Sequence, residues 1–192
     1  MLRTKHSLFI FLVINLLFLF CFSLSITSAA FTTPKLLAQY IPAGFVIDEK
    51  YSSIQNVGMF TATNIVARKV NQLPKPFMTP KFSDLALGYM ESSNVAYVTP
   101  MWQEAQQKAE NESQTQTNPQ KTFIGKETIH GGGEIYWYQG KNFNAQGAKG
   151  EASEVSFYAA TIIKQVDKGV LTIKITDFVD ERDVIRKCFQ GK

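Results

Sequence analysis

Four glutamates lie in the part of the chain that is richest in glycine and aromatic residues: Glu127, Glu134, Glu151 and Glu154. Two carboxylates held near one strand end can act as the acid and the base or nucleophile of glycoside hydrolysis. Nothing in the spacing of these glutamates fixes the distance between any two of them. Acidic residues are also common on solvated loops, so we expect surface charge here rather than a catalytic pair.

A glycine run follows the histidine at position 130, giving His130-Gly131-Gly132-Gly133. This run resembles the oxyanion-hole motif of some esterases and lipases, in which backbone amides stabilise a tetrahedral intermediate. The sequence has no Gly-x-Ser-x-Gly turn to supply the nucleophile, and its other histidine is His6. We therefore expect a turn before a strand. A small hydrolase that uses His130 with a nearby glutamate remains an alternative hypothesis.

Cys188 is the one cysteine that follows the N-terminal thirty residues. A thiol–imidazole pair with His130 would be a possible nucleophile. The spacing places Cys188 on the apolar face of a C-terminal helix, however, where an unpaired cysteine is usually buried and inert. One histidine and one cysteine without a carboxylate cluster at ligand spacing do not indicate a metal site. We predict no catalytic residue, no metal and no cofactor.

Three consecutive aromatic residues, Tyr136, Trp137 and Tyr138, are the most informative feature. On a strand, Trp137 points to the same side as Ile135, and the two tyrosines point to the other side. If that other side is open, Tyr136 and Tyr138 form a platform for a ligand or a protein partner. If it is covered, they are core residues. We take Tyr136 and Tyr138 as candidate binding residues.

The first thirty residues have the order of an export signal. Arg3 and Lys5 precede an almost wholly apolar run at 7–26, and small residues follow as far as Ala30. This order is typical of a secretory signal peptide, which we expect to be cleaved after Ala30. The alternative is an uncleaved membrane anchor, because the apolar run is long. Either interpretation predicts a secreted, periplasmic or otherwise extracytoplasmic domain.

The charge balance excludes one class of partner. The chain carries 20 Lys and Arg against 16 Asp and Glu, and two of the basic residues fall in the expected signal. The remaining basic residues are scattered along the sequence. Nucleic-acid binding needs clustered lysine and arginine, so we expect no nucleic-acid partner. We expect contact with a membrane only through the N-terminal segment, should it stay uncleaved.

The N-terminal half gives a mixed pattern. Proline and good helix formers predict short helices at 35–40 and 101–109. Residues rich in threonine and branched apolar side chains predict a strand at 58–70. Four prolines from Pro74 to Pro100 predict irregular structure between them, with one short strand at 94–98. The polar stretch at about 110–121 predicts a loop inside one domain, because the halves on either side are small for separate domains.

The C-terminal half gives a clearer pattern. A strand is predicted at 134–139, and strands at 154–166 and 170–178 form a hairpin whose turn places Gly169 in the left-handed conformation. A helix at about 181–189 follows, with Asp180 as its cap and Val184 and Cys188 on its buried face. Together these elements predict an α+β fold for residues 31–192. We expect a single domain with an antiparallel sheet, covered on one side by two or three helices.

No nucleophile with a base, no metal set and no cofactor fingerprint emerges from the sequence. The hypothesis it favours is a non-enzymatic extracytoplasmic domain that binds a protein partner or a small ligand. A structural component of the cell envelope is a further alternative, beside the hydrolase that uses His130.

Overall fold

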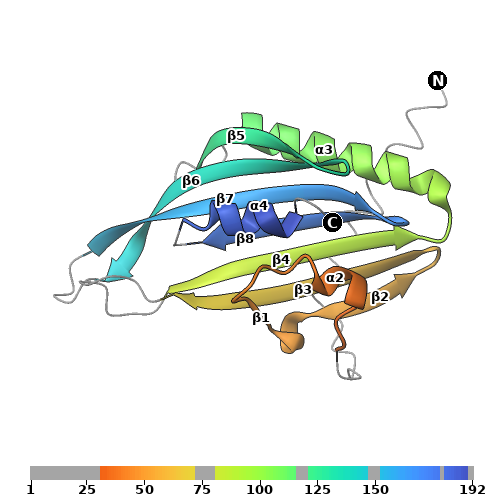
Figure 1. Ribbon diagram of the computed structural model, residues 1–192, viewed down its shortest axis with the longest axis horizontal. Coiled ribbons are helices and arrows are strands. Elements are labelled where there is room, and N and C mark those ends of the chain that lie inside the picture. Colours follow the sequence, from red (N-terminus) through yellow and green to blue (C-terminus); the bar gives the residue numbers. More distant parts are fainter. Residues whose placement is uncertain (1–30, 72–80, 116–120, 147–151, 178–179, 190–192) are drawn as a thin grey trace. The chain divides into compact units, whose positions relative to one another are not determined.

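The computed structural model describes residues 31–71, 81–115, 121–146, 152–177 and 180–189 (Figure 1). The expected export signal lies outside the described residues, so its presence and its cleavage stay predictions. None of the described helices is both long enough and apolar enough to cross a bilayer. From Phe31 onward, the described residues belong to one compact unit.

Eight strands of the described chain form one antiparallel sheet, which confirms the predicted α+β class. Their order across the sheet is β1-β3-β4-β8-β7-β6-β5, and β2 pairs with β3 beside β1. The strands are β1 (Val46–Ile47), β2 (Ser53–Val57), β3 (Phe60–Asn71), β4 (Lys81–Ser92), β5 (Lys121–Ile129), β6 (Gly133–Gln146), β7 (Ala152–Val166) and β8 (Gly169–Asp177). The helices are α2 (Lys35–Ala38), α3 (Val98–Gln114) and α4 (Arg182–Phe189), with short 3₁₀ turns at Glu49–Tyr51 and Val95–Tyr97.

Strand β4 overturns the irregular structure expected between the prolines. It pairs with β3 from Phe60↔Ser92 to Asn71↔Lys81, and along its other edge with β8. A proline cannot donate to a ladder of backbone hydrogen bonds. The prolines before β4 end at Pro80 and the next is Pro100, so none interrupts the ladder.

The strand expected at 94–98 is also wrong. The Asn94 side chain accepts a hydrogen bond from the Ala96 amide at 3.0 Å, which starts a 3₁₀ turn that leads directly into α3. A side-chain contact of this kind competes with strand pairing.

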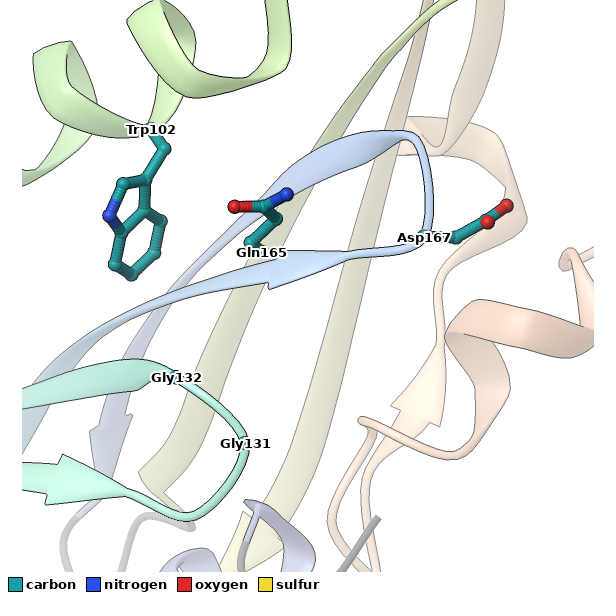
Figure 2. Close-up of a pocket in the computed structure, with 5 residues that line it drawn as sticks. All are labelled: Trp102, Gly131, Gly132, Gln165 and Asp167. Atoms are coloured by element: carbon teal, nitrogen blue, oxygen red, sulfur yellow. The ribbon is translucent and has the colours of Figure 1, made fainter. Parts of the chain in front are cut away.

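Helix α3 is longer than predicted at both ends. It includes 110–114, which we had assigned to the polar loop, and residues 116–120 lie outside the described residues. Its polar C-terminal half is stabilised by contacts along the helix, such as that from Gln107 Nε2 to Asn111 Oδ1 at 3.0 Å. The N-terminal half of α3 lies above the turns that join β5 to β6 and β7 to β8 (Figure 2).

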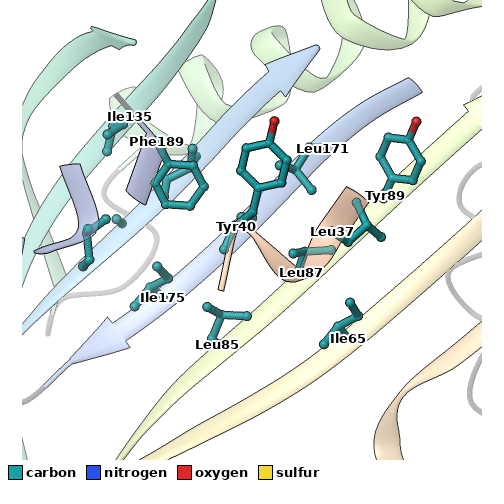
Figure 3. Close-up of a cluster of buried hydrophobic side chains, with 14 of the residues drawn as sticks. Leu37, Tyr40, Ile65, Leu85, Leu87, Tyr89, Ile135, Leu171, Ile175 and Phe189 are labelled. Atoms are coloured by element: carbon teal, nitrogen blue, oxygen red, sulfur yellow. The ribbon is translucent and has the colours of Figure 1, made fainter. Parts of the chain in front are cut away.

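The two faces of the sheet carry separate apolar clusters. Helices α2 and α4 pack on one face, where Tyr40 and Phe189 stack with ring centroids 5.9 Å apart (Figure 3). Helix α3 packs on the opposite face. Helices therefore cover both faces, and the prediction of helices on one side only is wrong. Each face of an antiparallel sheet that presents apolar side chains needs its own cover.

The hairpin between β7 and β8 corrects one detail of the predicted turn. The left-handed residue is Asp167, with φ 49°, and not Gly169. Glycine is required at 169 for a different reason: a Cβ there would lie 2.5 Å from the Met90 carbonyl oxygen. In α4, Cys188 packs against the core as predicted, but Val184 is exposed.

Candidate functional site

A cleft of about 310 Å³ opens between α3 and the β5–β6 hairpin. We name it the glutamine cleft, because three glutamines of α3 line it together with a small set of charged and aromatic residues from the sheet. The lining residues are Gln103, Gln106, Gln107, Glu110, Lys126, Glu134 and Tyr136.

Helical and strand periodicity bring these side chains together. Gln103, Gln106, Gln107 and Glu110 are spaced by three or four residues, so they share one side of α3. On the sheet, Lys126 of β5 pairs directly with Tyr136 of β6. Glu134 lies two residues before Tyr136, and residues at this spacing point to the same face of a strand.

A hydrogen-bonded ion network forms the base of the cleft. Lys126 Nζ lies 2.9 Å from Glu134 Oε1 and 3.3 Å from Glu110 Oε2. The Tyr136 hydroxyl donates to Glu134 Oε2 at 2.6 Å and lies 3.2 Å from Glu110 Oε2. One ammonium and one hydroxyl thus join a carboxylate of the helix to a carboxylate of the sheet.

The network holds its groups in their ordinary protonation states. Burial raises the pKa of Glu134, but hydrogen bonds from Tyr136, Lys126 and Gln106 outweigh burial, so this pKa lies below its usual value. The hydrogen bond to Glu134 raises the pKa of Lys126, with further support from Tyr136 and Glu110. Burial and the bond to Glu134 raise the pKa of Tyr136. Glu134 is therefore ionised at neutral pH and poorly suited to act as a general acid.

The remaining polar groups of the cleft are neutral amides. Each glutamine side chain offers both a donor and an acceptor, and Gln106 already hydrogen-bonds to Glu134. Lys126 Nζ occupies the position between the two carboxylates that a cation would otherwise take. Among the described residues, no group of histidine, cysteine and carboxylate side chains could hold a metal ion.

The structure places both candidate tyrosines beneath α3. Tyr136 is 1% exposed and Tyr138 is 3% exposed, whereas Ile135 and Trp137 pack on the opposite face as the alternation predicts. The open face that a stacking platform requires is therefore absent at both positions. The Tyr136 hydroxyl nevertheless borders the glutamine cleft. That either tyrosine contacts a ligand stays a prediction.

The other candidate side chains are not brought together. Glu127 forms an ion pair with Arg186 of α4. Glu134 is joined to Glu110 through the Tyr136 hydroxyl, and not to Glu127. Glu151 and Glu154 lie where the structure describes no side chains. The His130 imidazole is exposed and, within the described chain, pairs with no carboxylate.

Cys188 Sγ lies 3.4 Å from the Gln39 carbonyl oxygen. Its environment is thus the junction of α4 with the residues after α2, and His130 lies in the turn between β5 and β6. The hydrolase hypothesis gains no support from either residue.

Sequence reasoning missed the contribution of α3 to the site. Gln103, Gln106 and Gln107 recur at helical spacing and Glu110 continues the pattern, which is a signal for one polar helix face. Nothing in the sequence shows that this face borders Glu134.

Compared with known proteins, the chain gives no significant match to a family model, to a curated protein or to a solved structure.

Proposed function

We propose that the protein is a non-enzymatic extracytoplasmic domain that binds an uncharged ligand, rich in hydroxyl or amide groups, in the glutamine cleft. The extracytoplasmic location rests on the basic, apolar and small residues of 1–30. The binding site rests on the ion network of Lys126, Glu110, Glu134 and Tyr136 at the base of the cleft.

The network favours binding over catalysis. Its carboxylates, ammonium and hydroxyl are already paired with one another, and Glu134 has a lowered pKa instead of the raised one that a general acid needs. Side chains held by several partners lose little conformational freedom when a ligand arrives. A preorganised polar site therefore loses less conformational entropy on binding, which increases its affinity for the ligand.

The charge of the cleft favours a neutral ligand. A charged ligand would compete with the ion pairs of the network, and leaving the partly buried Glu134 carboxylate without Lys126 and Tyr136 would cost free energy. The three glutamine amides carry no charge. Gln106 bonds to Glu134 and Gln107 bonds to Asn111, and the donor and acceptor sites that these bonds leave can serve hydroxyl and amide groups of a ligand.

The test is a titration of the ¹⁵N-labelled protein with a panel of uncharged saccharides and uncharged peptides, followed by NMR. We expect at least one class to shift the side-chain amide signals of Gln103, Gln106 and Gln107. Replacing these three with alanine should weaken that binding by about tenfold or more. Gln139→Ala is the matched control, because Gln139 is exposed on β6 and does not line the cleft.

Two results would count against the proposal. One is a panel that leaves all three glutamine amide signals unchanged. The other is a triple variant that is folded and binds as tightly as Gln139→Ala.

A further inference from the structure

A second cavity, of about 340 Å³, lies beside the N-terminal half of α3 (Figure 2). We name it the Trp102 pocket. Its walls come from α3 and from the turns of two hairpins, β5–β6 and β7–β8, and its lining residues are Trp102, Gly131, Gly132, Gln165 and Asp167.

The indole of Trp102 forms one wall of the pocket. Figure 2 shows it projecting from α3 toward the β5–β6 turn, with the Gln165 side chain beside it. Trp102 also packs against the apolar cluster beneath α3 and is partly buried there. Because this packing holds the ring, its accessible part is a preformed apolar surface.

Bare backbone forms the opposite wall. Gly131 and Gly132 both have φ of +81°, which side chains rarely adopt. A Cβ on Gly132 would meet no atom within 4 Å, and one on Gly131 would meet only Lys164 Nζ at 3.8 Å. The turn therefore leaves open space in front of its peptide groups, and a ligand can approach them closely.

The polar groups that face the pocket are neutral. Gln165 is exposed and contributes a side-chain amide, whereas the Asp167 carboxylate is directed away from Trp102 in Figure 2. Lys164 approaches the turn from the other face of the sheet and donates to the His130 carbonyl oxygen at 3.5 Å. The side chains that face the pocket therefore offer no negative charge beside the indole to attract a cation.

We propose that the Trp102 pocket binds one pyranose ring of a neutral oligosaccharide. A pyranose has a C–H face that packs on an indole, and a rim of hydroxyl groups that bond to amides and backbone. A peptide fits less well, because the pocket offers neither an apolar hole for a side chain nor an unpaired strand edge. Its walls are a helix, two turns and the end of β7, which is paired on both sides by β6 and β8.

The two cavities follow one another along the molecule. Gln106 of the glutamine cleft lies four residues after Trp102 on α3, a spacing that makes the two side chains neighbours, and Glu134 of the same cleft follows the glycine turn by two residues. An oligosaccharide with one ring against Trp102 would thus place its next units beside the glutamines. This assignment rests on the proposed function, since it names the ligand class of the neighbouring glutamine cleft.

The experiment is a titration of the ¹⁵N-labelled full chain with neutral tetrasaccharides built from β-linked glucose, N-acetylglucosamine or mannose. We expect one of them, at about millimolar concentration, to shift the Trp102 indole signal and the Gly131 and Gly132 amides. Trp102→Ala should weaken this binding by about tenfold. Gln165→Ala should weaken it less, and because Gln165 is exposed this variant tests the pocket even if Trp102→Ala does not fold.

Trp137→Phe is the matched control for the indole, because Trp137 is 3% exposed and packs on the opposite face. Three outcomes would overturn the assignment: no tetrasaccharide shifts the Trp102 indole, a neutral proline-rich peptide shifts it instead, or binding is unchanged in Trp102→Ala and Gln165→Ala. Shifts confined to the glutamines, with Trp102 unaffected, would refute this inference and leave the proposed function standing.

Discussion

The two faces of the sheet differ in what their side chains do. On the face under α2 and α4, Leu171, Ile173 and Ile175 are at most 1% exposed and belong to one continuous apolar cluster (Figure 3). On the face under α3, the neighbouring Thr172 and Thr176 are partly exposed, and the cluster is smaller.

The same contrast appears at the level of polar groups. The glutamine cleft and the Trp102 pocket both lie beside α3. The first face therefore holds most of the fold together, whereas the second combines packing with accessible polar groups. A site can be altered on the second face at a smaller cost in stability than on the first.

The largest effect should come from deleting a side chain on the α2/α4 face. Ile173→Ala removes a side chain that is 0% exposed, and we expect a loss of about 2–5 kcal/mol in the free energy of unfolding. Thr172→Ala, one residue away on the other face, should change it by about 0.5 kcal/mol or less. Urea unfolding of both variants measures the difference. Equal losses of unfolding free energy in the two variants would show that both faces of the sheet contribute equally to stability.

The second largest loss of stability is expected from Gly169→Ala, which tests how tightly the α2/α4 face is packed. A Cβ on Gly169 would lie 2.5 Å from the Met90 carbonyl oxygen and 2.7 Å from the Tyr89 ring. Gly169→Ala should therefore cost about 1–3 kcal/mol, because the backbone of β4 or β8 must move. Gly125→Ala on β5 is the control, since its Cβ would meet no atom within 4 Å. A Gly169→Ala variant as stable as the control would contradict the close approach of β4 and β8.

A smaller effect is expected on the α3 face. Tyr136→Phe keeps the buried ring but removes the hydroxyl that joins Glu134 to Glu110, so we expect a loss of about 1–2 kcal/mol. Tyr97→Phe, where the side chain is exposed, should have almost no effect. Chemical denaturation gives both values. A loss as large as that of Ile173→Ala would mean that the network, and not the α2/α4 face, dominates stability.

The smallest effect concerns a charge on the α2/α4 face. Lys164 is 4% exposed, and burial lowers the pKa of its ammonium. Between that lowered pKa and the unfolded value of about 10.4, the unfolded chain binds more protons, so stability rises with pH. Lys164→Met removes the free-energy cost of burying this ammonium. The variant should therefore be more stable than the parent at neutral pH, by less than about 1 kcal/mol.

The pH dependence is the discriminating measurement. The stability difference between Lys164→Met and the parent should shrink as the pH rises from 7 toward about 10.4. A difference that grows with pH would have the wrong sign and would refute a lowered pKa at Lys164.

The sequence was enough to predict which side chains of a strand share a side. It was not enough to predict which helices cover each face of the sheet. Alternation correctly separated Trp137 from Tyr136, because successive side chains of a strand point to opposite sides. The extent of α3 was underestimated, since 110–114 is polar and polar residues are equally common in loops and on solvated helix faces.

The candidate site was missed for a related reason. Tyr136 and Lys126 join Glu110 to Glu134 only because α3 packs on this face of the sheet, and Glu110 lies beyond the predicted end of the helix. Local patterns contain no information on a contact of this kind until the helix is placed on the sheet.

The stacking of Tyr40 on Phe189 has a consequence for the order of folding. It joins residues from the two ends of the described chain within one apolar cluster, and β8 must also insert between β4 and β7 before that cluster is complete. Helix α4 follows every strand of the sheet along the chain, so the α2/α4 face cannot close before α4 has been synthesised. Contacts between distant segments also slow folding. Because Tyr40 and Phe189 lie so far apart along the chain, we expect their contact to form late in folding.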